Sequence, residues 1–237
     1  PYTLFSVPPP PSFPSPPRGG ALSFVPPPAA RFRVLLVDDS GDLTLNNTTI
    51  SGGSTDAWGG GIYVSPGGQA TLTGSIILGN QAYSGGGIAT KLGTVTLTNS
   101  VVSGNTAANQ GGGIFSNLGN VTLTDSTVSA NEAGGRGGGI AVAHGNVIAL
   151  TASTVRGNTA GNGGGAVYLL GGTVTLTNTT ITDNTTIAGD GGGILNRGGS
   201  TTITNSTITA NSAAAGGGGL HEEHQLAQVT LIRSLIA

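Results

Sequence analysis

Cysteine is absent from this chain of 237 residues, which excludes a disulfide framework and a thiolate metal site. Charge is scarce as well, because only 8% of the residues are charged and the formal net charge is -2. A nucleic-acid partner needs a basic surface, so this balance argues against one. The 36% of hydrophobic residues argues against disorder. No run approaches the roughly 18 apolar residues that span a bilayer, so we expect no membrane-spanning segment.

Glycine, by contrast, is abundant, and its placement repeats. The chain holds 44 glycines, and groups of three followed by an aliphatic residue recur at intervals of 26 or 28 residues. A repeat with such a period is typical of a solenoid. Within each repeat, apolar runs, a glycine turn and a strictly alternating segment such as residues 95–98 indicate three short strands. The glycine groups begin at Gly59, Gly85, Gly111, Gly137, Gly163, Gly191 and Gly217.

Three strands per repeat predict a triangular coil, and stacking buries the side chains that one coil cannot bury alone. We therefore expect an all-β, single-domain, three-sided parallel β-helix of about eight coils, each of about 26 residues. Equivalent residues would form columns, with one buried aliphatic column through Leu97 and Leu123 and another through Val102 and Val128. An asparagine follows the third strand of each coil, and these residues should stack in a hydrogen-bonded ladder. They are Asn80, Asn105, Asn131, Asn158, Asn184 and Asn211.

Residues 1–30 differ from the rest, since 11 of the 12 prolines lie there. Proline removes backbone donors and favours extended polyproline II. We therefore divide the chain into a proline-rich arm, residues 1–30, and a parallel β-helix, residues 31–237. The arm is either a flexible linker or a segment that docks along a groove, and its apolar side chains favour docking. Those expected at a subunit contact are Leu4, Phe5, Val7, Phe13 and Phe24.

A glycine group with isoleucine, as in residues 111–114, is followed by an aliphatic residue three before an asparagine, as in Val128 and Asn131. This motif resembles the repeat of the polymorphic outer-membrane protein family. It is also similar to the right-handed, pectate-lyase-like β-helix repeats of large bacterial surface proteins. The resemblance covers about residues 40–237. It implies a right-handed β-helix and an exported protein with an adhesive or structural role, and it carries over no catalytic residue.

The acidic residues are scattered, whereas sugar-cleaving β-helix enzymes need clustered carboxylates. Asp125, for example, aligns with Asn99 and Ala152 in the adjacent coils. His221 and His224 belong to the densest polar cluster, but on a strand they point to opposite faces, so a polar rim or subunit contact is the simpler interpretation. We therefore expect no enzyme, no cofactor and no metal site.

Outward threonines form a second regular pattern, at alternate positions of the middle strand such as Thr96 and Thr98. This pattern resembles the arrays of β-solenoid ice-binding proteins, so an ice-binding or carbohydrate-active β-helix stays an alternative. The simpler explanation is that threonine suits exposed strand positions and packs against its copies in the next coil.

An outward apolar column on the first strand of each coil predicts a contact surface for the arm. We expect Tyr63, Phe115, Val167 and Leu195 to belong to it. The chain starts without methionine and stops within a coil, which indicates a processed product or a fragment and leaves strand edges open. These features favour a secreted, extracellular subunit that binds copies of itself end to end in a surface filament. A fragment of an adhesin or autotransporter-like passenger, with surface glycans as possible partners, is the alternative.

Overall fold

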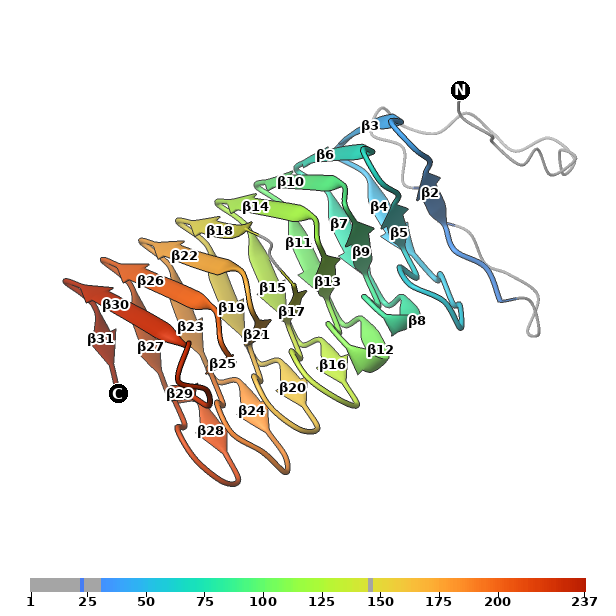
Figure 1. Ribbon diagram of the computed structural model, residues 1–237. Coiled ribbons are helices and arrows are strands. Elements are labelled where there is room, and N and C mark those ends of the chain that lie inside the picture. Colours follow the sequence, from blue (N-terminus) through green and yellow to red (C-terminus); the bar gives the residue numbers. More distant parts are fainter. Residues whose placement is uncertain (1–21, 24–30, 145–146) are drawn as a thin grey trace, which may run out of the picture.

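The computed structural model describes the backbone of residues 22–23 and the whole of residues 31–144 and 147–237. These residues form one stack of coils built from strands, with no helix among them (Figure 1). Each named strand pairs in parallel with its equivalent in the next coil, about 26 residues along the chain. The predicted β-solenoid of about eight turns is therefore confirmed. The arm residues expected at a contact, Leu4, Phe5, Val7, Phe13 and Phe24, lie outside the described residues.

Three sheets run the length of the stack. The first-strand sheet consists of β2 (Leu35–Val37), β5 (Ile62–Val64), β9 (Ile88–Lys91), β13 (Ile114–Asn117), β17 (Ile140–Ala143), β21 (Val167–Leu170), β25 (Ile194–Asn196) and β29 (Leu220–Glu222). The threonine sheet consists of β3 (Asp42–Asn46), β6 (Gln69–Thr73), β10 (Thr94–Thr98), β14 (Asn120–Thr124), β18 (Val147–Thr151), β22 (Thr173–Thr177), β26 (Ser200–Thr204) and β30 (Gln228–Ile232). The third-strand sheet consists of β1 (Leu22–Ser23), β4 (Thr49–Ser51), β7 (Ile76–Leu78), β11 (Val101–Ser103), β15 (Thr127–Ser129), β19 (Thr154–Arg156), β23 (Thr180–Thr182), β27 (Thr207–Thr209) and β31 (Leu235–Ile236).

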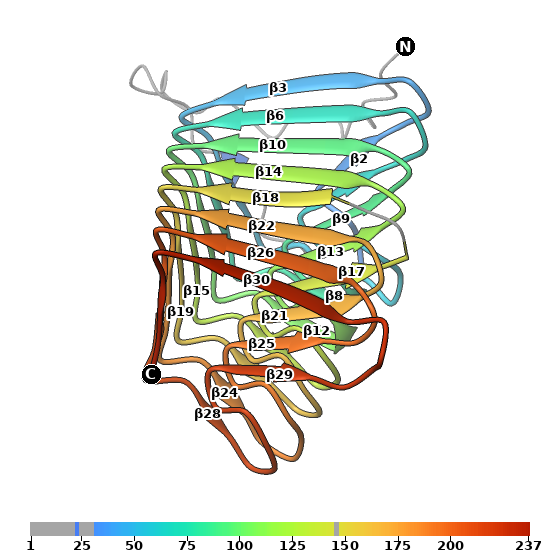
Figure 2. The same cartoon turned by 60° about the vertical axis from the view of Figure 1, so that its left-hand side comes forward.

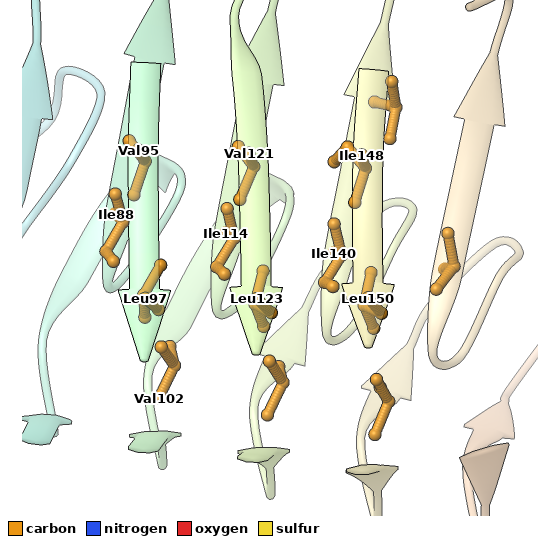
Figure 3. Packing of buried hydrophobic residues seen from close by; sticks show 14 of the residues in the cluster. Ile88, Val95, Leu97, Val102, Ile114, Val121, Leu123, Ile140, Ile148 and Leu150 are labelled. Carbon is orange, nitrogen blue, oxygen red and sulfur yellow. The ribbon is translucent and has the colours of Figure 1, made fainter. Parts of the chain in front are cut away.

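The side chains that alternate inward along these strands fill one continuous core. Leu97, Leu123 and Leu150 are paired in register across the threonine sheet, and all three are fully buried. Figure 3 shows these leucines repeating from coil to coil, with Val95, Val121 and Ile148 in a second row. Each fully buried aliphatic side chain contributes about 1.5–3 kcal/mol relative to an exposed one. Both predicted aliphatic columns are present in the predicted register.

A fourth, smaller sheet was not predicted from the sequence. This loop sheet follows the asparagine of each coil, and Figure 2 shows β8, β12, β24 and β28 at the corner far from the threonine sheet. Most of its strands are only two residues long, with a buried small side chain such as Ala133 or Ala160, so they lack a period-two signal. Its strands are β8 (Gln81–Ser84), β12 (Thr106–Gln110), β16 (Glu132–Ala133), β20 (Thr159–Ala160), β24 (Thr185–Thr186) and β28 (Ser212–Ala213).

The coil that contains β21 is shifted by one residue from the predicted register. Gly164, with φ of 63°, takes the corner position that Gly137 holds with φ of 67° in the preceding coil. Val167 then pairs with Ile140 and lies in the core, while Tyr168 pairs with Ala141 on the outward side. The prediction that Val167 points outward is therefore wrong. Alignment of the glycine groups by their first members places Ala166 in the isoleucine column, whereas the branched Val167 fits that column better.

Candidate functional site

The six predicted ladder asparagines lie one above another where the third strand of each coil ends. Asn131 illustrates the pattern: its side-chain nitrogen donates to Asn158 Oδ1 at 2.9 Å and to the Val102 carbonyl at 3.0 Å. Its side-chain oxygen accepts from the backbone and the side-chain nitrogen of Asn105, both at 3.0 Å. The same amide-to-amide bonds link Asn80 to Asn105 and Asn158 through Asn184 to Asn211. A buried amide with all these partners rigidifies the corner and gives it a structural role.

A second ladder, of hydroxyl groups, was missed by the sequence analysis. The Ser126 hydroxyl accepts from the Ser100 backbone N–H at 3.1 Å and donates to the Thr124 carbonyl at 2.8 Å. A serine or threonine occurs five residues before every ladder asparagine, so the signal was present in the repeat. The residue before the hydroxyl adopts a left-handed conformation, as in Asp125 with φ of 50°. This isolated acid therefore occupies a turn position that asparagine and aspartate tolerate.

The apolar column on the first-strand sheet is buried inside the chain, which contradicts its predicted role as an exposed contact surface. Phe115 and Leu195 are at most 5% exposed, and Tyr168 is fully buried. Tyr63, at the N-terminal end of the column, is half-buried. These side chains form a second apolar cluster with Ala89, Ala141 and Ala143.

The loops of the fourth sheet cover this column. Trp58, just before a glycine group, places its indole edge-on to Phe115 with ring centroids 5.0 Å apart. Arg136, at the equivalent place of a later coil, lies over the Tyr168 ring at 5.2 Å. Where these loops cover it, the column is not the exposed docking surface that was expected.

The polar cluster near the C-terminal end is dispersed. His221 lies in the outward column beside Leu195, and its Nδ1 is 3.9 Å from Asp190 Oδ1. Glu222 is exposed, and its neighbour Glu223 forms an ion pair with Arg197 at 3.0 Å. Within residues 31–144 and 147–237, no three His, Cys, Asp or Glu side chains are grouped so that they could hold a metal ion.

The threonine sheet presents the regular face that the sequence indicated. Thr96 pairs with Thr71 and Thr122, and Thr98 pairs with Thr73 and Thr124, so two outward columns run along the sheet. Ala149 interrupts one column and Ile232 ends the other. Most of these threonines are half-buried, because each packs against its copies in the neighbouring coils.

Comparison with known protein families bears on one coil of this stack. Residues 99–117 match the Chlamydia polymorphic membrane protein repeat. The matched stretch contains Asn105 of the ladder and the glycine corner before Ile114, so both halves of the motif lie within it. The match and the stacked coils fit a β-helix repeat of the surface-protein kind. No curated protein and no solved structure matches the chain.

This surface-protein repeat points to a protein of the cell surface or outer membrane. None of the described segments is a helix long and apolar enough to cross a membrane. The match spans a small part of the chain, and the fold of the remaining coils rests on the strand register described above.

The coil that ends with β31 leaves core positions uncovered. Leu231 belongs to the same column as the buried Leu176 and Ile203, yet it is 51% exposed. Ile236 on β31, which continues the column of the buried Ile208, packs against the core but is only partly buried. The outer edges of β29, β30 and β31 have no further strand beside them among the described residues. An apolar surface framed by unpaired strand edges favours association with another strand.

Proposed function

We propose that this chain is an extracellular structural β-solenoid of the bacterial cell surface, and that copies of it stack end to end. The in-register pairing of each strand with its equivalent in the next coil, along the whole of the described stack, is the observation that carries the proposal. The match to a surface-protein repeat supports the location. A structural role needs no clustered acids or metal ligands, and the ladders supply the rigidity that a surface rod requires.

In the threonine sheet, the two ends of the stack are complementary in sequence pattern. β3 begins the threonine sheet and β30 ends it, so a second copy's β3 can follow β30 without a change of register. Leu43 and Leu45 would then lie on Val229 and Leu231, which continues both inward columns. Such a head-to-tail contact does not close on itself and therefore extends into a filament.

Substitutions in β30 test this stacking. Leu231→Lys places a charge in the stacking face, whereas Ile232→Lys adds the same charge one residue later, on the outward side of the strand. We expect wild-type protein and the Ile232→Lys variant to form concentration-dependent rods in negative-stain electron microscopy and sedimentation velocity. The Leu231→Lys variant should remain monomeric with an unchanged circular-dichroism spectrum. Wild-type protein that stays monomeric at high concentration would refute the stacking.

An adhesive module of a larger surface protein is the second candidate, favoured by the family of the matched repeat. Isolated short rods in the microscopy experiment would move this candidate to first place. Location at the surface is tested separately, by treating intact cells that express the protein with a protease. Rapid cleavage on intact cells supports a surface location, and protection until lysis contradicts it.

A further inference from the structure

Aromatic side chains are rare in this protein, yet three of them line one hollow. Trp, Tyr and Phe account for 4% of the sequence. Trp58, Tyr63 and Tyr83 surround a cavity of about 340 Å³ near the N-terminal end of the stack, between β5 and β8. A cavity of this size lies at the lower end of the range for small-ligand sites. The remaining lining residues are Arg33, Asp56 and Ala57.

The aromatic walls are held in place before any ligand arrives. Trp58 packs edge-on to Tyr63 at 6.4 Å and to Phe115 at 5.0 Å between ring centroids. The indole reaches Phe115 because the intervening residue of the column is the small Ala89. The Tyr83 backbone N–H donates to the Ala57 carbonyl at 2.9 Å, which fixes β8 opposite this wall. A preorganised wall lowers the entropy that binding costs.

The hollow interrupts the repeat. The position of Trp58 is occupied in later coils by Ser84, Gln110, Arg136, Gly163 and Asp190, none of which is aromatic. Tyr83 is 49% exposed. In β12, the next strand of the loop sheet, residues 107–109 are two alanines and an asparagine, so the aromatic side chain is not repeated there. A purely structural repeat gives no reason for an exposed tyrosine and the only tryptophan, in adjacent coils, to line one hollow.

Capping of the first coils explains only part of this cluster. Arg33 donates through Nε and Nη2 to the carbonyls of Trp58 and Gly59, at 2.7–3.1 Å, where a preceding coil would otherwise supply backbone donors. It also lies over the Tyr63 ring at 4.7 Å. This accounts for Arg33 and one face of Tyr63. It does not account for Asp56, whose side chain is 77% exposed and paired with Arg31, or for the ring of Tyr83.

We propose that this hollow, lined by Trp58, Tyr63, Tyr83 and Asp56, binds a saccharide. A sugar ring presents an apolar C–H face that stacks on an aromatic side chain, and hydroxyl groups at its rim that bond to a carboxylate or a phenol. The lining contains both kinds of group. A proline-rich peptide also docks on aromatic side chains, but proline has no backbone N–H to donate to the Asp56 carboxylate, and a nucleic acid would require a basic surface. Saccharide binding at this hollow does not depend on end-to-end stacking.

The single tryptophan makes the site directly observable, because Trp58 fluorescence reports on the hollow alone. The 237-residue protein would be titrated with hexamers of glucose, N-acetylglucosamine and galacturonate, and with a peptide of residues 1–30. We expect at least one saccharide to shift the fluorescence saturably. Tyr83→Ala and Asp56→Asn should each weaken that binding by about tenfold or more.

Ile187→Ala is the matched control, since Ile187 is exposed beside a loop strand of a distant coil. It should bind as the wild type does, and each variant is compared with the wild type by circular dichroism. Absence of a saturable shift with all three saccharides would overturn the proposal. So would equal binding by the Tyr83→Ala variant, or tighter competitive binding by the peptide of residues 1–30. Sedimentation of the same samples keeps this result separate from the stacking proposal.

Discussion

Removal of one amide from the middle of the asparagine ladder should destabilise the stack strongly. Asn131 is 1% exposed and takes part in the four hydrogen bonds to Val102, Asn158 and Asn105 described above. Each such bond contributes about 0.5–1.5 kcal/mol net, so Asn131→Ala should lower the free energy of unfolding by about 2–6 kcal/mol. The upper part of this range applies if the abandoned partners stay buried without water.

An isosteric substitution separates hydrogen bonding from packing. Asn131→Asp keeps the size of the side chain but replaces its donating nitrogen with an oxygen that faces Asn158 Oδ1 and the Val102 carbonyl. Burial, together with the two acceptor oxygens that the new oxygen faces, should raise the pKa of the introduced carboxyl above its unfolded value of about 3.9. Relative to wild type, the variant should therefore be most stable below that value. Its stability should fall as the pH rises through the raised native pKa.

Urea denaturation followed by circular dichroism measures both effects. Asn120→Ala is the control, because Asn120 is exposed on β14 and accepts one bond, at 3.3 Å, from Val147. We expect a change within about 0.5 kcal/mol for this surface site. Hydrogen exchange should place the Asn131→Ala opening in the coils beside β15, since solenoid coils contact only their neighbours. A loss from Asn131→Ala no larger than that of the control would refute the structural role of the ladder.

Three further substitutions test the glycine corner and the buried column. Gly137→Ala should lower the free energy of unfolding, measured by urea denaturation, by about 1 kcal/mol more than Gly157→Ala. Both glycines have positive φ, but only a Cβ at Gly137 would meet backbone and the Ala141 side chain. Tyr168→Phe should be neutral or stabilise by about 1 kcal/mol, because the buried hydroxyl lacks a partner among the described residues; a loss above 2 kcal/mol in thermal unfolding would contradict this. Burial raises the pKa of Tyr63 above 10.0, with Arg33 lowering it and Asp39 raising it. The stability contributed by the neutral Tyr63 side chain is fully present below pH 10.0 and is lost as the pH rises through the native pKa of Tyr63. Tyr63→Phe should therefore lessen the loss of stability at alkaline pH.

The sequence predicted the parts of this fold that depend on period and register. Alternation along residues 95–98 and the recurrence of Val102 and Asn105 are sufficient to place the columns, because a strand has one inward face and coils stack in register. The loop sheet could not be predicted in the same way, since two-residue strands such as β16 carry no alternation. That omission explains the wrong prediction about the apolar column of the first-strand sheet. Without the covering loops, Phe115 and Leu195 were expected to be exposed.

The register error at Val167 has a different physical origin. Ala166 stands where the preceding coil has Gly139, so a run of glycines does not fix its own alignment, whereas a branched residue in the core does. The aromatic hollow was missed because Tyr83 lies one coil further along the chain than Trp58 and Tyr63. Pairing of each coil with the next brings them together.

Direction is a property that the asparagine ladder gives to the whole stack. Every bond between ladder amides runs the same way, from the nitrogen of one asparagine to the oxygen of the asparagine in the following coil. The amide dipoles are therefore aligned along the axis, and aligned hydrogen bonds polarise one another. One end of the rod is electrically unlike the other. Two rods joined through like ends would place their dipoles in opposition. Head-to-tail alignment along a common axis is therefore favoured.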